Sequence, residues 1–168
     1  MEHHDKKEYS KTLEASTVFD LQRFLNTADD LDAFGIVGVY RYLEIYLLRQ
    51  TVIKNLPEAV LPNMEGRYNH FRDNFEQCHS LVNAHYQRYL SSRSYFKDLN
   101  FQIGRLEYSE ESSVGPYGVI NYIRNEVIGK KRSISSVCRE ATTKDNDFYC
   151  QHFFDRLQKE IDILAKTN

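Results

Sequence analysis

An apolar stripe at helical spacing runs through residues 68–90, and it constrains the fold more than any other stretch of the chain. The stripe recurs at i, i+4, i+7, i+11, i+15 and i+18 through Phe71, Phe75, Cys78, Val82, Tyr86 and Tyr89. This periodicity is typical of an amphipathic α-helix that buries one face. It predicts a helix over residues 67–96, the third along the chain.

A row of polar residues lies one position round from the stripe and consists of Arg72, Glu76, His79 and Asn83. On one helix, this spacing places an arginine, a carboxylate, an imidazole and an amide in a line beside the buried face. The row is the densest group of potentially reactive side chains in the sequence. A structural interpretation stands beside the functional one: Arg72 and Glu76 form an i,i+4 ion pair worth about 0.2–0.5 kcal/mol, and His79 is a boundary residue.

The rest of the chain is mostly helical in pattern. We predict further helices over residues 12–25, 29–54, 117–128 and 134–141, and a last helix capped by Asp145 or Asp147. Residues 55–66 carry two prolines and predict a linker, residues 100–108 predict a short strand or irregular segment, and residues 1–8 predict a flexible tail. At 168 residues, the chain is expected to form a single all-α domain, a bundle of about five main helices.

Composition narrows the classes of protein to which the chain can belong. Only 3 Pro and 7 Gly favour a few long helices, and a net charge of −2 argues against binding nucleic acid over the whole surface. A local basic patch, Lys130–Arg132 (Lys130, Lys131 and Arg132), is still compatible with that charge. The three cysteines lack CxxC spacing and predict reduced thiols in a cytoplasmic protein. The apolar run 34–48 is too short to span a bilayer, so no membrane association is expected.

Metal and cofactor motifs are weak in this sequence. Glu76 and His79 form one ExxH, whereas di-iron bundles need two such pairs and further glutamates. Residues 94–97 match SxxK without the companion motifs of that enzyme class. Cys78 and His79 are adjacent, and adjacent helical side chains do not face each other. The sequence therefore predicts neither a metal site nor a cofactor.

Two segments, RDNFEQ at residues 72–77 and RNEVIG at residues 124–129, resemble the motif of the HEPN family. That family comprises small all-α domains common in bacterial toxin–antitoxin and phage-defence systems. Its signature is an arginine and a histidine separated by four to six residues, the first often polar. The resemblance implies a dimer in which the two side chains converge to cleave RNA without metal, by acid–base activation of the 2′-hydroxyl.

The match to that signature is partial. With six intervening residues, Arg72 reaches His79, whereas with four the histidine position holds Gln77 in the first segment and Gly129 in the second. No histidine follows Arg124 at the family's spacing. The resemblance covers the all-α plan and a short segment at each place.

Three functional hypotheses follow. The first is a non-catalytic, HEPN-like interaction module that binds RNA or a protein partner and forms a homodimer through its aromatic-rich helices. The second is a metal-independent ribonuclease with Arg72 and His79 as the catalytic pair. The third is a small-ligand sensor with a pocket between aromatic helices. The binding residues expected across these hypotheses are Glu44, Glu76, Arg124, Asn125, Lys130, Lys131 and Arg132.

Glu44 stands out because its helix is apolar nearly all round. A buried carboxylate without a partner is costly. Arg72 or Arg124 would provide such a partner, and the alternative is that Glu44 points to solvent. An apolar cavity beside Glu44 would favour the small-ligand hypothesis.

Overall fold

The computed structural model describes residues 27–105, 111–143 and 147–167, and these residues contain helices and no β-strand. The helices are α2 (Gly35–Leu48), α3 (Leu56–Asn74), α4 (His79–Ile103), α5 (Gly115–Tyr122), α6 (Ile134–Thr143) and α7 (Phe148–Thr167), with a 3₁₀ turn η1 (Ile53–Asn55) and a π-helix η2 (Ile123–Gly129). The predicted all-α class is confirmed, but the chain is divided into more and shorter helices than expected. The predicted tail and the helix over residues 12–25 lie outside the described residues.

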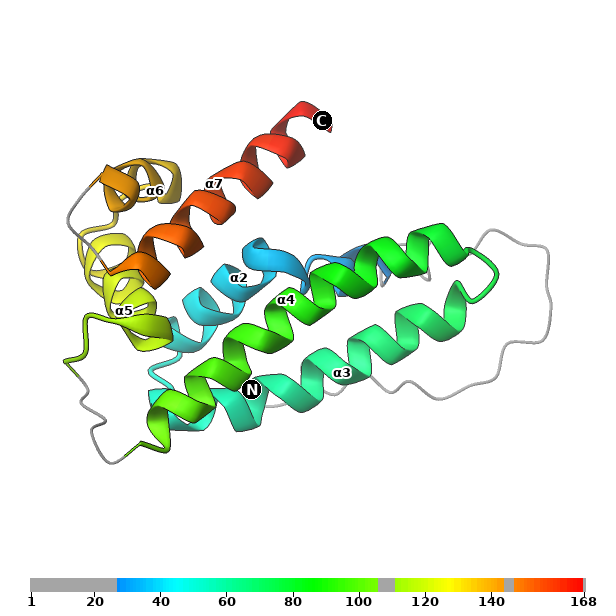
Figure 1. The fold of residues 1–168 in the computed structure, drawn as a ribbon, viewed down its shortest axis with the longest axis horizontal. Coiled ribbons are helices and arrows are strands. Elements are labelled where there is room, and N and C mark those ends of the chain that lie inside the picture. Colours follow the sequence, from blue (N-terminus) through cyan, green and yellow to red (C-terminus); the bar gives the residue numbers. More distant parts are fainter. Residues whose placement is uncertain (1–26, 106–110, 144–146, 168) are drawn as a thin grey trace.

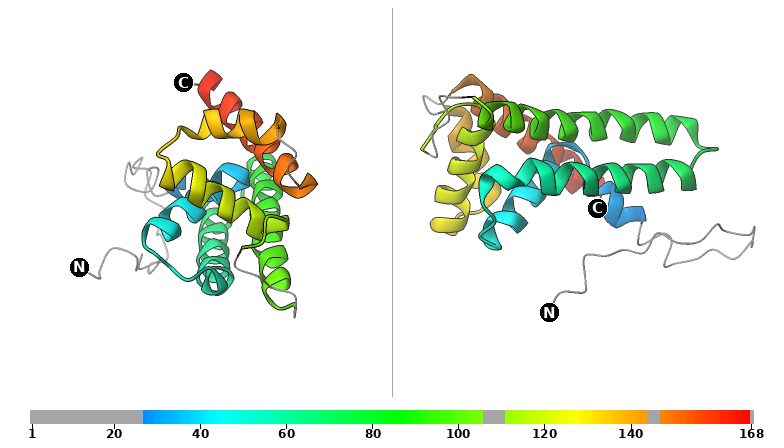
Figure 2. Two further views of the ribbon diagram at one scale, coloured as in Figure 1. Left: turned by 90° about the vertical axis from the view of Figure 1, so that its left-hand side faces the viewer. Right: turned by 90° about the horizontal axis from the view of Figure 1, so that it is seen from below.

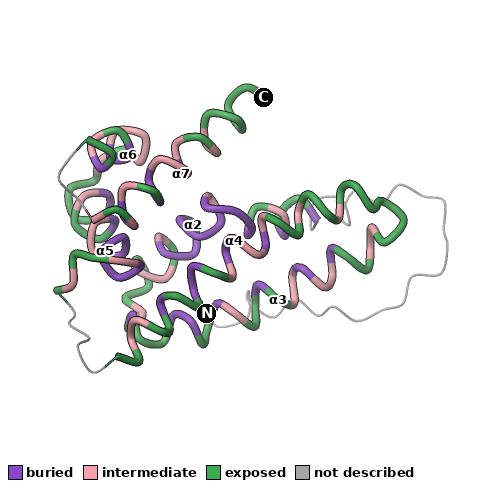
Figure 3. The backbone as a smooth tube through the Cα atoms, viewed as in Figure 1, coloured by how far each residue is buried: buried purple, intermediate pink, exposed green. Residues whose placement is uncertain are grey.

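The molecule has a long arm and a compact end (Figure 1). α4 has 25 residues, so it extends over roughly 37 Å, and α3 packs antiparallel against it to form a projecting hairpin (Figure 2). α5, η2 and α6 gather at the end opposite the hairpin tip. α2 packs against both α4 and α7 and contributes much of the buried core (Figure 3).

The prediction of one continuous helix over residues 67–96 is wrong, because the chain reverses its direction at residues 75–78. The Cys78 N–H donates to the Phe75 carbonyl at 2.8 Å, and α4 begins at the next residue. α3 and α4 then pack against each other: the Tyr68 ring stacks on that of Tyr89 with centroids 4.4 Å apart. The helical periodicity is therefore real, but its two ends, Phe71 and Tyr89, are buried on two different helices of the hairpin, and Cys78 at the turn is exposed.

The linker predicted over residues 55–66 is also wrong, since these residues form the first half of α3. Pro57 lies in the first turn, where a helix does not use the missing N–H. Pro62 lies inside the helix and removes one hydrogen bond, to the carbonyl of Glu58. Both Pro62 and Glu58 are exposed, so the loss falls on the solvent side of α3.

The single helix predicted over residues 29–54 is interrupted at residues 32–34, after which α2 begins at Gly35. α2 ends at Leu48, six residues before the predicted end at Lys54. Gln50 adopts a left-handed conformation with φ of 57°. Its N–H donates to the Leu47 carbonyl and the Thr51 N–H donates to the Tyr46 carbonyl, both at 3.0 Å. This is the Schellman pattern that usually has glycine at the left-handed position. The sequence carries no glycine there, so the usual marker of a helix end is missing.

The start of α2 is the point where α4 and α7 meet. No side chain of the preceding residue caps the helix, and the Glu160 carboxylate of α7 instead accepts the N–H groups of Ile36 at 3.0 Å and Val37 at 3.2 Å. From α4, Ser92 donates its hydroxyl to the Gly35 carbonyl at 3.0 Å. Gly35 has φ of 83°, a conformation that favours glycine. These contacts fix the spacing between α4 and α7.

Predictions for the late chain agree more closely with the structure. The helix expected to end before Gly129 instead includes this residue, because its last part is the π-helix η2, and the left-handed residue beyond it is Lys131. α6 covers the short helix expected over residues 134–141. Asp147 caps α7 as one of the two predicted alternatives, because its Oδ2 accepts the Tyr149 N–H at 3.1 Å. The irregular segment expected at residues 100–108 is wrong over residues 100–103, which continue α4, and residues 106–110 lie outside the description.

All three cysteines are free thiols. Cys138 and Cys150 are buried, and this burial raises the pKa of each thiol to about 12. Cys78 is exposed at the tip of the hairpin, contrary to the expected position of this cysteine in the apolar stripe. The reversal of the chain at the tip explains this difference.

Candidate functional site

The predicted polar row does not form a common surface on one helix. Arg72 lies near the end of α3, Glu76 in the turn, and His79 at the first position of α4, and all three residues are exposed. The Arg72 guanidinium donates to the Asp73 carboxylate, at 2.9 Å from Nη2 and 3.1 Å from Nε. The predicted ion pair between Arg72 and Glu76 is therefore replaced by a pair between sequence neighbours.

Glu44 has a partner that the sequence did not indicate. The Tyr40 hydroxyl donates to Glu44 Oε1 at 2.7 Å, within the same helix. Burial of the Tyr40 phenol and this carboxylate both raise the pKa of Tyr40. Figure 2 places η2, which carries Arg124, at the opposite end of the molecule from the hairpin tip that carries Arg72. Glu44, Arg72 and Arg124 therefore form no common site.

The binding residues predicted near η2 are largely engaged with one another. Lys130 and Arg132 each bind the Glu126 carboxylate at 2.8 Å, and Arg132 also pairs with Glu140. The hydrogen bonds from Lys130 and Arg132 lower the pKa of Glu126. A cation that already has a carboxylate partner offers less attraction to phosphate. Lys131 is exposed, with a left-handed φ of 52°.

Arg124 and Asn125 of η2 line a hollow of about 390 Å³. Both residues are exposed, and the Arg124 guanidinium donates to the Asn121 side chain at 3.3 Å. π-helices are rare and often occur at functional sites. This hollow is thus the part of the predicted site that the structure keeps together.

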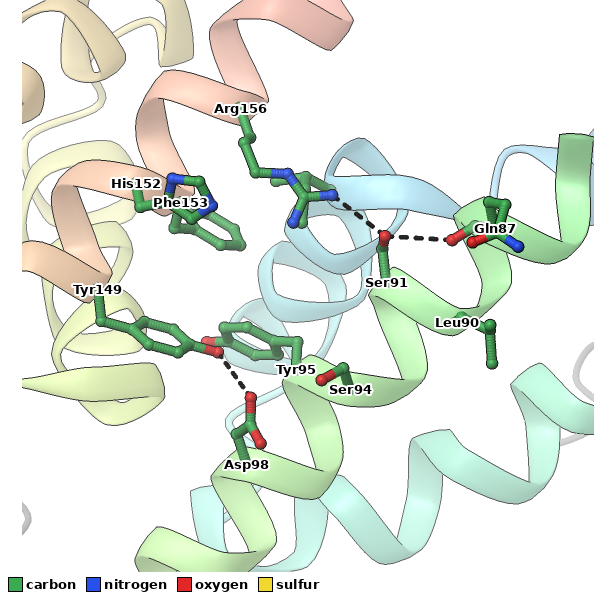
Figure 4. A pocket seen from close by; sticks show the side chains of 11 residues that line it. Gln87, Leu90, Ser91, Ser94, Tyr95, Asp98, Tyr149, His152, Phe153 and Arg156 are labelled. Atoms are coloured by element: carbon green, nitrogen blue, oxygen red, sulfur yellow. Dashed lines mark hydrogen bonds between the residues drawn. The ribbon is translucent and has the colours of Figure 1, made fainter.

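A groove that the sequence did not indicate lies between α4 and α7 (Figure 4). Its volume is about 370 Å³, and both polar and aromatic side chains line it. The lining residues on α4 are Gln87, Leu90, Ser91, Ser94, Tyr95 and Asp98, those on α7 are Tyr149, His152, Phe153 and Arg156, and α2 adds Ile36. The groove combines a cation, an anion, an imidazole and several hydroxyls on a partly apolar surface.

The Arg156 guanidinium projects from α7 across the groove toward α4 (Figure 4). Its one hydrogen bond runs from Nη2 to the Ser91 hydroxyl at 3.1 Å, and the residue is half-buried. No carboxylate in the part of the chain that the structure describes lies within ion-pair distance of it. A guanidinium has five N–H donors, so most of the hydrogen-bonding capacity of Arg156 is available in the groove.

The other end of the groove carries Asp98 of α4 (Figure 4). The Tyr149 hydroxyl of α7 donates to Asp98 Oδ2 at 3.4 Å. Burial and the nearby carboxylate raise the pKa of Tyr149, so this phenol is a neutral donor. Tyr95 lies between the two charged residues, and its hydroxyl donates to the Pro116 carbonyl at 2.8 Å. The Tyr95 ring therefore forms part of the wall of the groove, while its hydroxyl is hydrogen-bonded outside the groove.

Helical spacing was the available indication of this site. Tyr149, His152, Phe153 and Arg156 follow one another at i, i+3, i+4 and i+7, so they share one face of α7. On α4, Ser91, Ser94, Tyr95 and Asp98 show the same spacing. Nothing in the sequence states that these two faces oppose each other, since they are far apart along the chain.

No family model matches this chain, and no match to it was found among the curated proteins or the solved structures. The resemblance to HEPN domains therefore stays a prediction. Among the residues that the structure describes, no three His, Cys, Asp or Glu side chains are placed to hold a metal ion together. None of the described helices has both the length and the apolar character that crossing a membrane requires.

Proposed function

We propose that this chain is a non-catalytic helical binding domain that takes an anionic ligand in the groove between α4 and α7. The observation that carries the proposal is the state of Arg156, a half-buried cation whose one hydrogen-bond partner among the described residues is a neutral hydroxyl. Partial burial of a charge is unfavourable unless the charge is paired. A ligand carboxylate or phosphate would supply the missing partner.

The other half-buried arginines divide into two that pair with carboxylates and two, Arg88 and Arg93, that have no carboxylate partner among the described residues. Arg67 lies within ion-pair distance of Asp29 and Asp30, and Arg132 pairs with Glu126 and Glu140. Arg156 has no carboxylate partner among the described residues either, and of these three unpaired arginines it is the one that lines the α4–α7 groove. The planar guanidinium can bind both oxygens of a carboxylate or phosphate at once, and His152 and Ser94 add further polar groups to the same groove.

This proposal develops the small-ligand hypothesis, with the pocket between aromatic helices but away from Glu44, which does not line the groove. RNA binding through Arg124 and Asn125 has less support because Lys130 and Arg132 already bind Glu126. The ribonuclease hypothesis centred on Arg72 and His79 stays a prediction, with the two residues on different helices of the hairpin. The predicted homodimer stays a prediction.

The test is a titration of the isotope-labelled protein with benzoate and, separately, with phenyl phosphate, followed by two-dimensional NMR. Backbone signals of Ser91, Ser94 and Tyr149 are expected to shift with at least one anion. Arg156→Gln is expected to abolish these shifts. Arg139→Gln is the matched control, because Arg139 is exposed on α6 and its side chain binds one carbonyl of its own helix.

Equal shifts in the wild type and in Arg156→Gln would contradict the proposal. An absence of groove shifts with both anions would contradict it as well. The two anions also separate the sources of the shared chemistry, since a preference for phenyl phosphate would indicate a phosphorylated ligand and a preference for benzoate would indicate a carboxylate.

A further inference from the structure

Opposite charges line the two ends of the groove without pairing with each other. Arg156 binds the Ser91 hydroxyl, and Asp98 accepts the Tyr149 hydroxyl. Neither side chain forms an ion pair within residues 27–105, 111–143 and 147–167. An anion at Arg156 occupies one end of the groove only, and the exposed Asp98 carboxylate offers an attractive position for a second, positive group of the same ligand.

The spacing of residues along α4 gives the distance between the two ends of the groove. Ser91, the partner of Arg156, and Asp98 are both on α4 and lie seven residues apart, which is two turns and on the order of 10 Å along the axis. Residues at i and i+7 lie on the same helix face. A ligand that satisfies both ends therefore has its negative and positive groups about 10 Å apart.

The surface between the charged ends is aromatic. The ring of Tyr95 lies 5.4 Å from the Phe153 ring and 6.3 Å from the Tyr149 ring, measured between centroids. The Tyr95 hydroxyl is already bound to the Pro116 carbonyl, so Tyr95 presents its ring to the groove. Ser94 lies between Ser91 and Asp98 on the same helix and is exposed, so its hydroxyl can form a hydrogen bond with a polar group of a ligand in the groove.

We infer that the groove binds a short linear peptide with two free ends, its terminal carboxylate on Arg156 and its terminal ammonium on Asp98. An extended chain advances about 3.3–3.6 Å per residue, so three residues match the distance between the two ends. The middle side chain of such a peptide would lie against Tyr95, Tyr149 and Phe153. The peptide would run antiparallel to α4. This inference rests on the proposed function, because it uses the same arginine.

The probe is the tripeptide Ala-Phe-Ala, compared with its N-acetyl form and its C-terminal amide. Binding is measured by isothermal titration calorimetry with the full chain and with the variants Arg156→Gln and Asp98→Asn. Both variants remove one charge at a partly or fully exposed position, and thermal unfolding confirms that they are folded. Arg139→Gln again serves as the control.

Amidation is expected to weaken binding to the wild type about tenfold, the effect of losing a charge-assisted bidentate contact. The same amidation is expected to have no effect on binding to Arg156→Gln. Acetylation is expected to weaken binding to the wild type about threefold, because Asp98 is exposed and solvent screens its attraction. In Asp98→Asn, the acetylated and free peptides are expected to bind equally.

The two proposals fail in different ways. If benzoate shifts the groove signals through Arg156 but acetylation of the tripeptide has no effect, or Ala-Phe-Ala does not bind, the peptide inference is wrong and the proposed function stands. If Ala-Ala or Ala-Ala-Phe-Ala-Ala binds as tightly as Ala-Phe-Ala, the length argument is wrong. If neither benzoate nor the tripeptide responds to Arg156→Gln, both proposals are wrong.

Discussion

The hairpin tip and the α4–α7 groove both gather charged and polar side chains, but they do so in different ways. At the tip, Arg72, Glu76 and His79 are neighbours along the chain, exposed to solvent, and Arg72 pairs with the next residue. In the groove, Arg156 and Ser91 are 65 positions apart and partly buried together. A dense run of polar residues on one segment is thus mostly a solvated surface, whereas a site requires tertiary packing that removes water from its groups.

The largest difference between the two regions is expected in stability. Leu157 on α7 is fully buried, and Leu157→Ala should lower the free energy of unfolding by about 2–5 kcal/mol, through lost burial and a cavity. Leu81 near the tip is 38% exposed, and Leu81→Ala should change it by less than about 0.5 kcal/mol. Urea unfolding measures both variants. Similar losses would mean that the tip is packed as tightly as the body.

A smaller loss is expected from the cap that joins α7 to α2. Glu160→Ala leaves the N–H groups of Ile36 and Val37 without their acceptor, and should cost about 1–2 kcal/mol of unfolding free energy. Glu160→Gln retains one acceptor oxygen and should lose less. Benzoate binding, measured in the same variants, should weaken because α7 is less firmly positioned. If Glu160→Ala were as stable as the wild type, the contact of Glu160 with the start of α2 would not be needed to position α7.

The hairpin itself should respond to pH through His85, whose ring lies 5.2 Å from that of Phe71. Burial, and then the charge of Arg88, lower the pKa of His85 from its usual 6.5. The unfolded chain therefore binds this proton more readily, and stability is full above about pH 7 and falls as the pH drops through 6.5 toward the folded pKa.

Urea unfolding from pH 5 to pH 8 tests this effect. The unfolding free energy of the wild type should fall as the pH drops below about 7, and His85→Gln should lack the part of this fall that His85 causes. The difference in unfolding free energy between the two proteins should therefore change with pH in this range. Parallel curves for the wild type and His85→Gln would show that burial of this imidazole does not differ between the folded and unfolded states.

The smallest effects are expected at the tip residues that the sequence singled out. Arg72→Ala and His79→Ala should each change the unfolding free energy by less than about 0.5 kcal/mol, because both side chains are exposed. Neither substitution should alter benzoate binding in the groove. Incubation with labelled RNA in EDTA tests the ribonuclease hypothesis directly: cleavage by the wild type that both variants lose would restore the tip as the functional site.

Sequence reasoning succeeded where a local rule decides the structure. Asp147 caps α7 because an aspartate before an apolar helix accepts its first N–H groups, and α6 covers the short helix expected over residues 134–141. It failed where the local markers were missing or ambiguous. Gln50 ends α2 in a conformation that usually has glycine, and Pro57 starts a helix in a segment that two prolines made look like a linker.

The candidate site was beyond local rules altogether. Arg156 and Asp98 are charged residues on amphipathic helices, where such residues are ordinary. Their importance comes from the packing of α7 beside α4, which Glu160, Gly35 and Ser92 establish at the start of α2. Because these contacts join residues far apart in the chain, periodicity could place each helix face but not the groove between them.

The unequal exposure of the three thiols has a practical consequence. Cys138 and Cys150 are buried, and their pKa of about 12 keeps them protonated and unreactive at neutral pH. Cys78 alone among the cysteines is exposed, and it lies at the far end of the hairpin. A maleimide-linked fluorophore or spin label would therefore attach at a single natural position. A label on Cys78 of the unaltered protein would thus report any movement of the α3–α4 hairpin when a ligand binds in the groove.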